Sequence, residues 1–275
     1  MTPELERMLL DCYPDILRQR HLSVRESCMA WGFTHGDGWF GIVDALLESV
    51  QVYAASAGLQ PETAQIKEKM GGLRVYWEGA DPFTFGAAMV AGEFAEKICE
   101  LTGERGRPTT RGGCLQTLSR AKAAELGAVA PRLQLVRTVG KGACVPPDVA
   151  PVPEIDWDPP TAHQLVERYS AIVHGPISVL DGSLDLVHAL LAGIASYNEH
   201  PVAITAISRV DGHLVVEHGG GDDYVDGAIV CAQAMARRVD PETGAIPIPE
   251  VWGQELVARK GRVPRGTLED GGENA

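Results

Sequence analysis

The sequence predicts an α+β fold made of two tandem helix–β-hairpin–helix repeats, because the two halves of the chain match each other. Three pairs of segments align without gaps and in the same order, at offsets of 156, 144 and 141 residues. In the longest pair, twelve of the 38 positions are identical. The matching segments are 9–17 with 165–173, 37–55 with 181–199, and 66–103 with 207–244. An internal duplication explains all three matches.

The matched segments carry the same secondary-structure signals in both halves. Apolar residues at helical spacing predict a helix that begins at an Asp-Gly cap, and a shorter helix precedes it. A β-hairpin follows, and then a second helix that begins after an acidic cap and ends at a glycine. The predicted strands are 63–69 with 73–79 and 203–209 with 214–220. The predicted helix caps are Asp37 or Gly38, Asp181 or Gly182, Asp81 and Asp222, and the terminal glycines are Gly103 and Gly244.

A two-stranded hairpin is only marginally stable by itself. We therefore expect the two hairpins to join into one four-stranded antiparallel sheet with pseudo-two-fold symmetry, with the helices packed on it. The alternative is two separate units in tandem. Because one duplicated chain can stand for a dimer of single-copy chains, we expect a monomer.

Composition restricts the class of protein and its partners. The chain has 275 residues and a formal net charge of −13, which argues against a protein that binds the phosphate backbone of nucleic acids. It has no apolar run of the roughly 20 residues that cross a bilayer, and its N-terminal stretch does not have the pattern of a secretory signal. We expect a cytoplasmic protein with reduced cysteines, without direct contact with nucleic acid or membrane.

Three stretches of the first half resemble a family of small, uncharacterised proteins of phages and bacterial genomes. They are WGFTHGDGWFGIVDAL (31–46), IKEKMGGLRVY (66–76) and the segment 98–127. The strings GDGWF and KEK-x-GGLR-x-Y are the most distinctive, and the resemblance covers roughly residues 8–127. The second half matches the family only weakly. The resemblance implies a phage or prophage context and no established activity.

Members of this family often carry four cysteine or histidine ligands of a zinc ribbon after the second helix. The corresponding positions here are Cys99, Thr102, Ser119 and Lys122, so a single zinc ligand is left. We expect this remnant to fold without metal. Cys28 and His35, seven residues apart, could also contribute to a metal site, although a buried thiol and a loop histidine are the simpler reading. We expect no metal and no cofactor.

The repeats and the proline-rich stretch between them divide the chain into four parts. These are 1–127, the first repeat with its metal-less zinc-ribbon-like remnant; 128–160, a proline-rich linker; 161–246, the second repeat; and 247–275, a partly disordered C-terminal tail.

Aromatic residues crowd the loop and helix start of the first repeat, whereas the second repeat has Ser183 and Leu184 in place of two of them. They either pack against residues 104–127 or anchor a partner protein. The candidate partner-binding residues are Trp31, Phe33, His35, Asp37, Trp39 and Phe40. Their expected counterparts in the second repeat are His174 and Asp181.

The sequence contains no HExxH, GxSxG, GxGxxG or P-loop string, and no residue is assigned a catalytic role. The first hypothesis is therefore a non-catalytic inhibitory protein from a phage or mobile element. It would act through an acidic surface on a host protein with a basic surface, such as a defence or nucleic-acid-handling protein. The alternative is a small-molecule-binding protein or hydrolase with its site at the junction of the two repeats, near His35 and Asp37 or His174 and Asp181.

Overall fold

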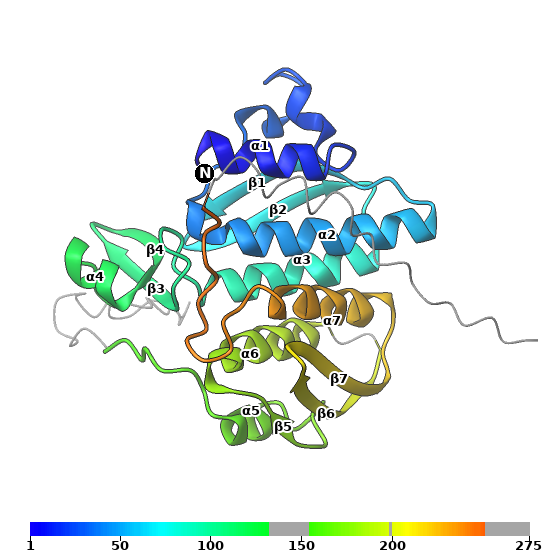
Figure 1. The fold of residues 1–275 in the computed structure, drawn as a ribbon, viewed down its shortest axis with the longest axis vertical. Helices are drawn as coiled ribbons and strands as arrows, with labels where there is room; N and C mark the ends of the chain where they lie inside the picture. The colour runs from blue at the N-terminus through cyan, green and yellow to red at the C-terminus, as the bar shows by residue number, and fades with distance from the viewer. Residues whose placement is uncertain (132–153, 198–199, 251–275) are drawn as a thin grey trace, which may run out of the picture.

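Four long helices lie in the middle of the protein, and small sheets lie outside them (Figure 1). The computed structural model describes residues 1–131, 154–197 and 200–250. In these ranges the fold is mixed α+β, with seven α-helices and sheets of two or three strands. The central helices are α2 (Phe40–Ala57), α3 (Pro82–Ala95), α6 (Asp181–Ser196) and α7 (Asp223–Ala236).

The order helix, strand, strand, helix occurs twice, as predicted. In the first half α2 is followed by β1 (Glu62–Lys69), β2 (Gly72–Glu78) and α3. In the second half α6 is followed by β6 (Val202–Val210), β7 (His213–Gly220) and α7. Short elements precede each set: α1 (Pro3–Cys12) and three 3-10 turns (Arg18–His21, Cys28–Trp31 and Asp37–Trp39) in the first half, and α5 (Ala162–Arg168) and β5 (Ile177–Ser178) in the second.

The two hairpins do not form the expected four-stranded sheet. β1 and β2 make a two-stranded sheet, and β5, β6 and β7 make a separate one. In each half, the outer edge of the first strand is already occupied by the chain segment before the central helix. Thr34 pairs with Lys67 of β1, and Ser178 of β5 pairs with Ser208 of β6. Because these segments take the backbone hydrogen bonds of that edge, it is not open to the other hairpin.

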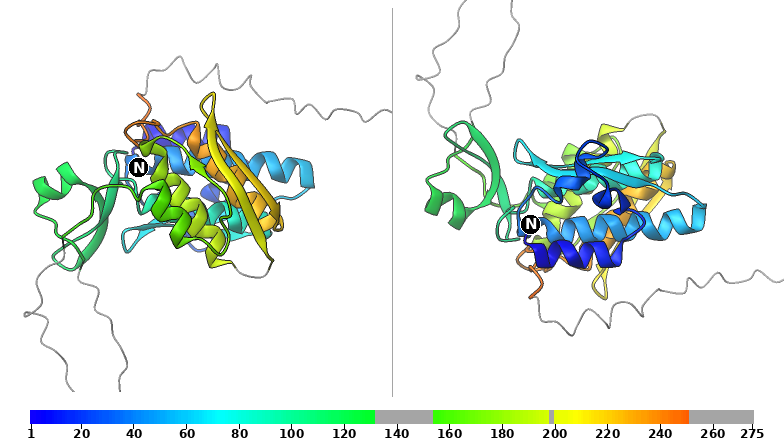
Figure 2. Two further views of the ribbon diagram at one scale, coloured as in Figure 1. Left: turned by 90° about the horizontal axis from the view of Figure 1, so that it is seen from below. Right: turned by 90° about the horizontal axis from the view of Figure 1, so that it is seen from above.

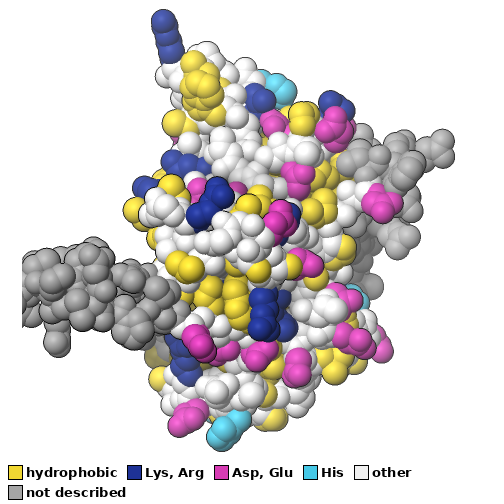
Figure 3. All heavy atoms as spheres, turned by 90° about the vertical axis from the view of Figure 1, so that its left-hand side faces the viewer, with side chains coloured by type: hydrophobic (Ala, Val, Ile, Leu, Met, Phe, Trp, Pro, Cys, Tyr) yellow, Lys and Arg dark blue, Asp and Glu magenta, His cyan; other side chains and the backbone are white. Residues whose placement is uncertain are grey.

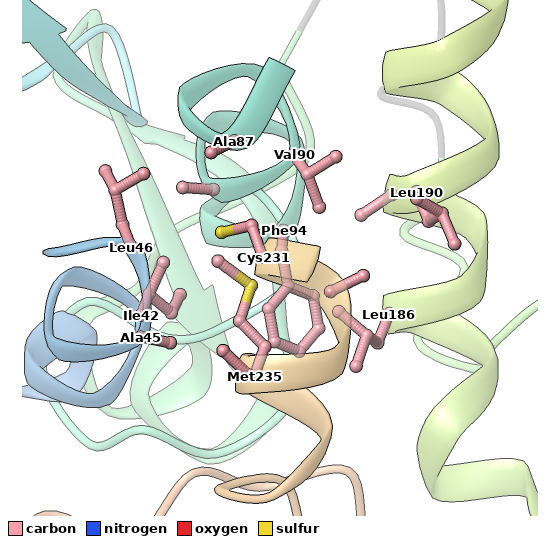
Figure 4. Packing of buried hydrophobic residues seen from close by; sticks show 14 of the residues in the cluster. Ile42, Ala45, Leu46, Ala87, Val90, Phe94, Leu186, Leu190, Cys231 and Met235 are labelled. Carbon is pink, nitrogen blue, oxygen red and sulfur yellow. The ribbon is translucent and has the colours of Figure 1, made fainter. Parts of the chain in front are cut away.

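The central helices pack against one another instead of covering a common sheet (Figure 4). The most extensive helix contact joins α3 and α7, and the reason is a pair of matched glycines. A Cβ on Gly86 would lie 1.9 Å from the carbonyl oxygen of Tyr224, and a Cβ on Gly227 would lie 2.0 Å from that of Phe83. The two backbones therefore touch where no larger residue fits. Around this contact one continuous core includes Ile42, Leu46, Val90, Phe94, Leu186, Leu190 and Met235.

The predicted helix ends were partly wrong. Asp81 and Asp222 do cap α3 and α7, accepting hydrogen bonds from the backbone N–H of Thr84, and of Tyr224 and Val225. In contrast, α2 begins at Phe40 after a 3-10 turn, and α6 begins at Asp181 itself, so neither has the expected Asp-Gly cap. α3 and α7 end at Ala95 and Ala236, eight residues before the expected glycines, because the backbone after each helix forms hydrogen bonds within its own loop. Cys99 N–H donates to the Glu104 carbonyl, and Asp240 N–H donates to that of Ala245.

A small unit projects from the first half beside the helices (Figures 1 and 2). It comprises β3 (Gly106–Arg111), β4 (Cys114–Ser119) and α4 (Arg120–Leu126). It includes two of the four positions of the zinc-ribbon pattern, Ser119 and Lys122, and a small apolar cluster joins it to the preceding Cys99. Cys99, Leu118 and Ala123 are buried together, and Trp157 packs against them from the segment before the second half.

Most of the predicted linker and tail, residues 132–153 and 251–275, lies outside the described residues. None of the helices in the described part is both long and apolar enough to span a membrane.

Candidate functional site

A pocket lies at the junction of the two halves. Its volume is about 530 Å³, within the range of small-molecule sites. The first half contributes the residues just after α3 and part of β3, and the second half contributes α5, α6 and the segment 156–160. Its charged and titratable lining includes Glu96, Lys97, Arg107, Arg168, Asp185 and His188.

A buried carboxylate, Asp185, is paired with two arginines and lines the pocket together with one of them, Arg107. The Asp185 side chain is 3% exposed and lies on α6 of the second half. Arg105 Nε lies 2.9 Å from Asp185 Oδ2, and Arg107 Nη2 lies 3.1 Å from Asp185 Oδ1. Both arginines come from the first half, so this buried cluster joins the halves. With two guanidinium groups on one carboxylate, it retains a net positive charge.

Lys97 lies beside this cluster without a carboxylate of its own. Its Nζ donates to the backbone carbonyl of Glu93 at 3.1 Å, and no ion pair of Lys97 occurs among the described residues. Burial lowers the pKa of Lys97, while the carboxylates of Glu93, Asp185 and Glu96 oppose this shift. An amine at this place is suited to contact an anionic group that enters the pocket.

His188 faces the same space from α6. Burial lowers its pKa to about 4, and the positive charges of Lys97, Arg168 and Arg107 act in the same direction. Its ring centroid lies 5.9 Å from that of Tyr169. The imidazole is therefore neutral at pH 7, in a region where three cations converge.

A second contact between the halves carries the matched residues, and there the charges are paired. By the sequence offsets, Tyr13 matches Tyr169, Asp44 matches His188, and Arg238 matches Lys97. Tyr13 Oη donates to Asp44 Oδ1 at 2.7 Å, and Arg238 Nη2 donates to Asp44 Oδ2 at 2.6 Å. One junction thus has a complete buried ion pair. At the other, a histidine replaces the carboxylate and a lysine faces the pocket.

Four of the six predicted partner-binding residues are buried. Phe33, His35, Trp39 and Phe40 are at most 5% exposed and belong to the interior, and the three aromatic residues are part of the main core. The packing is specific, since Trp39 Nε1 donates to the carbonyl of Ile98 at 2.8 Å. Asp37 is half-buried and accepts a hydrogen bond from the backbone N–H of Thr2, whereas Trp31 is 68% exposed.

The second half replaces Trp39 by other chemistry. Ser183 holds the matched position and accepts a hydrogen bond from Arg209 Nη1, whose Nη2 donates to the carbonyl of Val239. Val239 matches Ile98, so a guanidinium satisfies the carbonyl that the indole satisfies in the first half. This exchange explains why the second half needs no tryptophan.

The assignment of His174 as the counterpart of His35 was wrong. Thr34 and Ser178 make the same parallel pairing in the two halves, so the residue that matches His35 is Val179. Asp181 does match Asp37, because the glycine after each of them makes the same hydrogen bond. Gly38 N–H donates to the carbonyl of Glu100 after α3, and Gly182 N–H donates to the carbonyl of Pro241 after α7. His35, Asp37, His174 and Asp181 do not line the junction pocket.

Cys28 and His35 are not brought together as exposed ligands. Cys28 is exposed, and His35 is buried with its Nδ1 2.8 Å from the carbonyl of Gly36. The part of the chain that the structure describes contains no group of three or more His, Cys, Asp or Glu side chains placed to hold a metal ion.

No protein-family model matches this sequence, and no match was found among curated proteins or solved structures.

Proposed function

We propose that this chain is a binding protein for a small molecule with a negatively charged group, held in the junction pocket. We further propose that its halves are tandem repeats related by a pseudo-two-fold axis between α3 and α7. The reciprocal contacts of Gly86 and Gly227 support the symmetry. In this arrangement one of two equivalent junctions is closed by an ion pair, and the other is open for a ligand.

One observation carries the proposal: three cations of the pocket wall, Lys97, Arg107 and Arg168, lie close enough to His188 to add to the lowering of its pKa by burial, although the wall also carries five carboxylates. A carboxylate occupies the matched position in the other junction, where Asp44 binds Arg238. A ligand with a carboxylate or phosphate group would supply the negative charge that Lys97 and Arg168 lack. The wall also has apolar surface from Pro108 and Pro160, which suits an organic molecule.

The proposal is tested by measuring the melting temperature with a panel of small carboxylates and with inorganic phosphate. We expect at least one to raise the melting temperature of the wild type, because a ligand that binds only the folded state stabilises it. Lys97→Met should abolish the increase, and Lys69→Met, which removes an exposed lysine at the end of β1, should leave it unchanged.

An identical increase in wild type and Lys97→Met would show that the anion binds elsewhere. If no anion has an effect, the inhibitor hypothesis becomes the better one. A single observation favours that second function: Trp31 is exposed in the same segment as the exposed Leu22 and Val24. In that case, Trp31→Ala should abolish the recovery of a host protein that copurifies with the wild type.

The pocket also predicts a pH dependence of stability. In the unfolded chain, a histidine binds a proton near pH 6.5, whereas His188 in the folded protein does so near pH 4. As the pH falls from 6.5 to 4, the unfolded state takes up the proton first, so the free energy of unfolding decreases. Above pH 6.5, His188 makes its full contribution to the free energy of unfolding. About 1–3 kcal/mol of this contribution is lost by pH 4.

Urea unfolding at pH 7 and pH 4.5 measures this loss. His188→Gln should lose less stability over this interval than the wild type, and substitution of the exposed His174 by Gln should not change the loss. The remaining acid sensitivity should come partly from His35, since burial lowers its pKa to about 4 as well. Equal losses in wild type and His188→Gln would contradict the assignment.

A further inference from the structure

The junction pocket carries positive and negative charges on different parts of its wall. The cations gather around His188, as described above. Carboxyl groups line the pocket from two other places: Glu96, which directly follows α3 in the first half, and the segment with Asp156 and Asp158 before α5. The side of the molecule from which the β3–β4 unit projects likewise has acidic and basic side chains close together, and not one sign alone (Figure 3).

The segment with the two aspartates is held by its backbone, which leaves its carboxylates available. Arg107 Nε donates to the carbonyl of Asp156 at 3.1 Å, and Arg107 Nη2 donates to that of Asp158 at 2.8 Å. The guanidinium itself makes its ion pair with Asp185. Asp156 Oδ1 accepts the backbone N–H of Asp158 at 3.2 Å. Both aspartates are exposed at the pocket and form no ion pair within the described residues.

Glu96 adds a third carboxyl group on the first-half side. It is half-buried, lines the pocket next to Lys97, and its pKa is raised by burial and by the nearby Glu93. A positively charged group of a ligand would favour its ionised form. The pocket thus offers acceptors for a cation as well as donors for an anion.

We propose that the ligand is a small zwitterion of the amino-acid class, with one carboxylate and one ammonium group. Its carboxylate contacts Lys97 and Arg168 near His188, and its ammonium group contacts Asp156 and Asp158. Pro108 and Pro160 give apolar surface for the ligand's side chain. This inference rests on the proposed function, because it specifies the molecule that the same pocket binds. A ligand with charges of both signs matches the wall better than a simple anion, which would leave the aspartates facing it unpaired.

Calorimetric titration of the full chain with three related probes tests this inference. The probes are L-leucine, N-acetyl-L-leucine, which lacks the ammonium group, and L-leucinamide, which lacks the carboxylate. L-leucine should bind about tenfold or more tightly than either derivative, because each derivative loses a charge-assisted contact. The double variant Asp156→Asn/Asp158→Asn should weaken L-leucine binding, and it should leave binding of the anion N-acetyl-L-leucine unchanged or strengthen it, because two negative charges are removed from the wall.

Glu154→Gln is the matched control, since Glu154 is an exposed carboxylate on the same segment and does not line the pocket. It should bind L-leucine as the wild type does. If N-acetyl-L-leucine or a simple carboxylate binds as tightly as L-leucine, or binds when L-leucine does not, the zwitterion inference is wrong and the anion site remains. If neither the zwitterion nor any anion binds, the proposed function itself is wrong.

Discussion

Gly86→Ala is expected to destabilise the protein by about 3 kcal/mol or more, because an added methyl group cannot fit between α3 and α7. The Cβ of the new residue would lie 1.9 Å from the Tyr224 carbonyl oxygen and 2.8 Å from its carbon. Backbone atoms cannot move aside as a side chain can, so the two helices would have to separate. That separation would open the core between the halves. Chemical denaturation of the purified variant measures the effect.

Gly92→Ala is the control on the same helix. The nearest atom that its Cβ would meet is the Leu73 carbonyl oxygen, at an ordinary contact distance of 3.4 Å. Since alanine favours the helical conformation more than glycine does, the variant should be unchanged or more stable by up to about 1 kcal/mol. A Gly86→Ala variant that is as stable as Gly92→Ala would show that α3 and α7 do not touch through their backbones.

Arg238→Met is expected to destabilise the protein by about 3–5 kcal/mol, because it leaves a buried carboxylate without its cation. The side chains of Arg238 and Asp44 are 15% and 8% exposed. Arg238 Nε and Nη2 both donate to Asp44 Oδ2, at 2.8 and 2.6 Å. Methionine retains much of the apolar volume, so the loss reports mainly on the charge. The free energy of unfolding is again the measurement.

The neighbouring arginine gives the matched control. Arg237 is 41% exposed and its Nη2 lies 3.2 Å from Glu48 Oε2, an exposed pairing worth about 0–1 kcal/mol. Arg237→Met should therefore have a small effect. Adding Asp44→Asn to Arg238→Met should recover part of the stability, since the uncompensated charge is removed. Equal effects of the two arginine substitutions would mean that Asp44 is not buried against Arg238.

The local elements could be predicted from the sequence because their signals are local. Hairpin turns require residues that tolerate positive φ, and Met70-Gly71 and Asp211-Gly212 adopt such values, from 50° to 81°. Acidic caps at Asp81 and Asp222 likewise act within one helical turn. The joined sheet was predicted wrongly because strand pairing depends on which distant segments lie along each edge in the folded chain. The segments that do so, around Thr34 and Ser178, carry no strong strand pattern.

The site could not be found from motifs, since its residues come from five separate segments. Lys97, Arg107 and His188 are unremarkable individually, and only the fold brings them together. A signal was nevertheless present in the aligned halves. In the alignment of the two halves, Asp44 is matched by a histidine and Arg238 by a lysine. The charge pattern therefore differs between the two junctions. The aromatic residues before α2 were a less useful signal, because Phe33, Trp39 and Phe40 are buried in the core.

The most direct test of the central claim is to measure, by mass spectrometry, how fast reductive methylation modifies Lys97 with and without a saturating concentration of the tightest-binding carboxylate. The ligand should slow the modification of Lys97, because its anionic group would cover that amine in the junction pocket. The exposed Lys69 should react at the same rate in both samples. An unchanged rate at Lys97 while the ligand is bound would contradict the assignment of the junction pocket as the binding site.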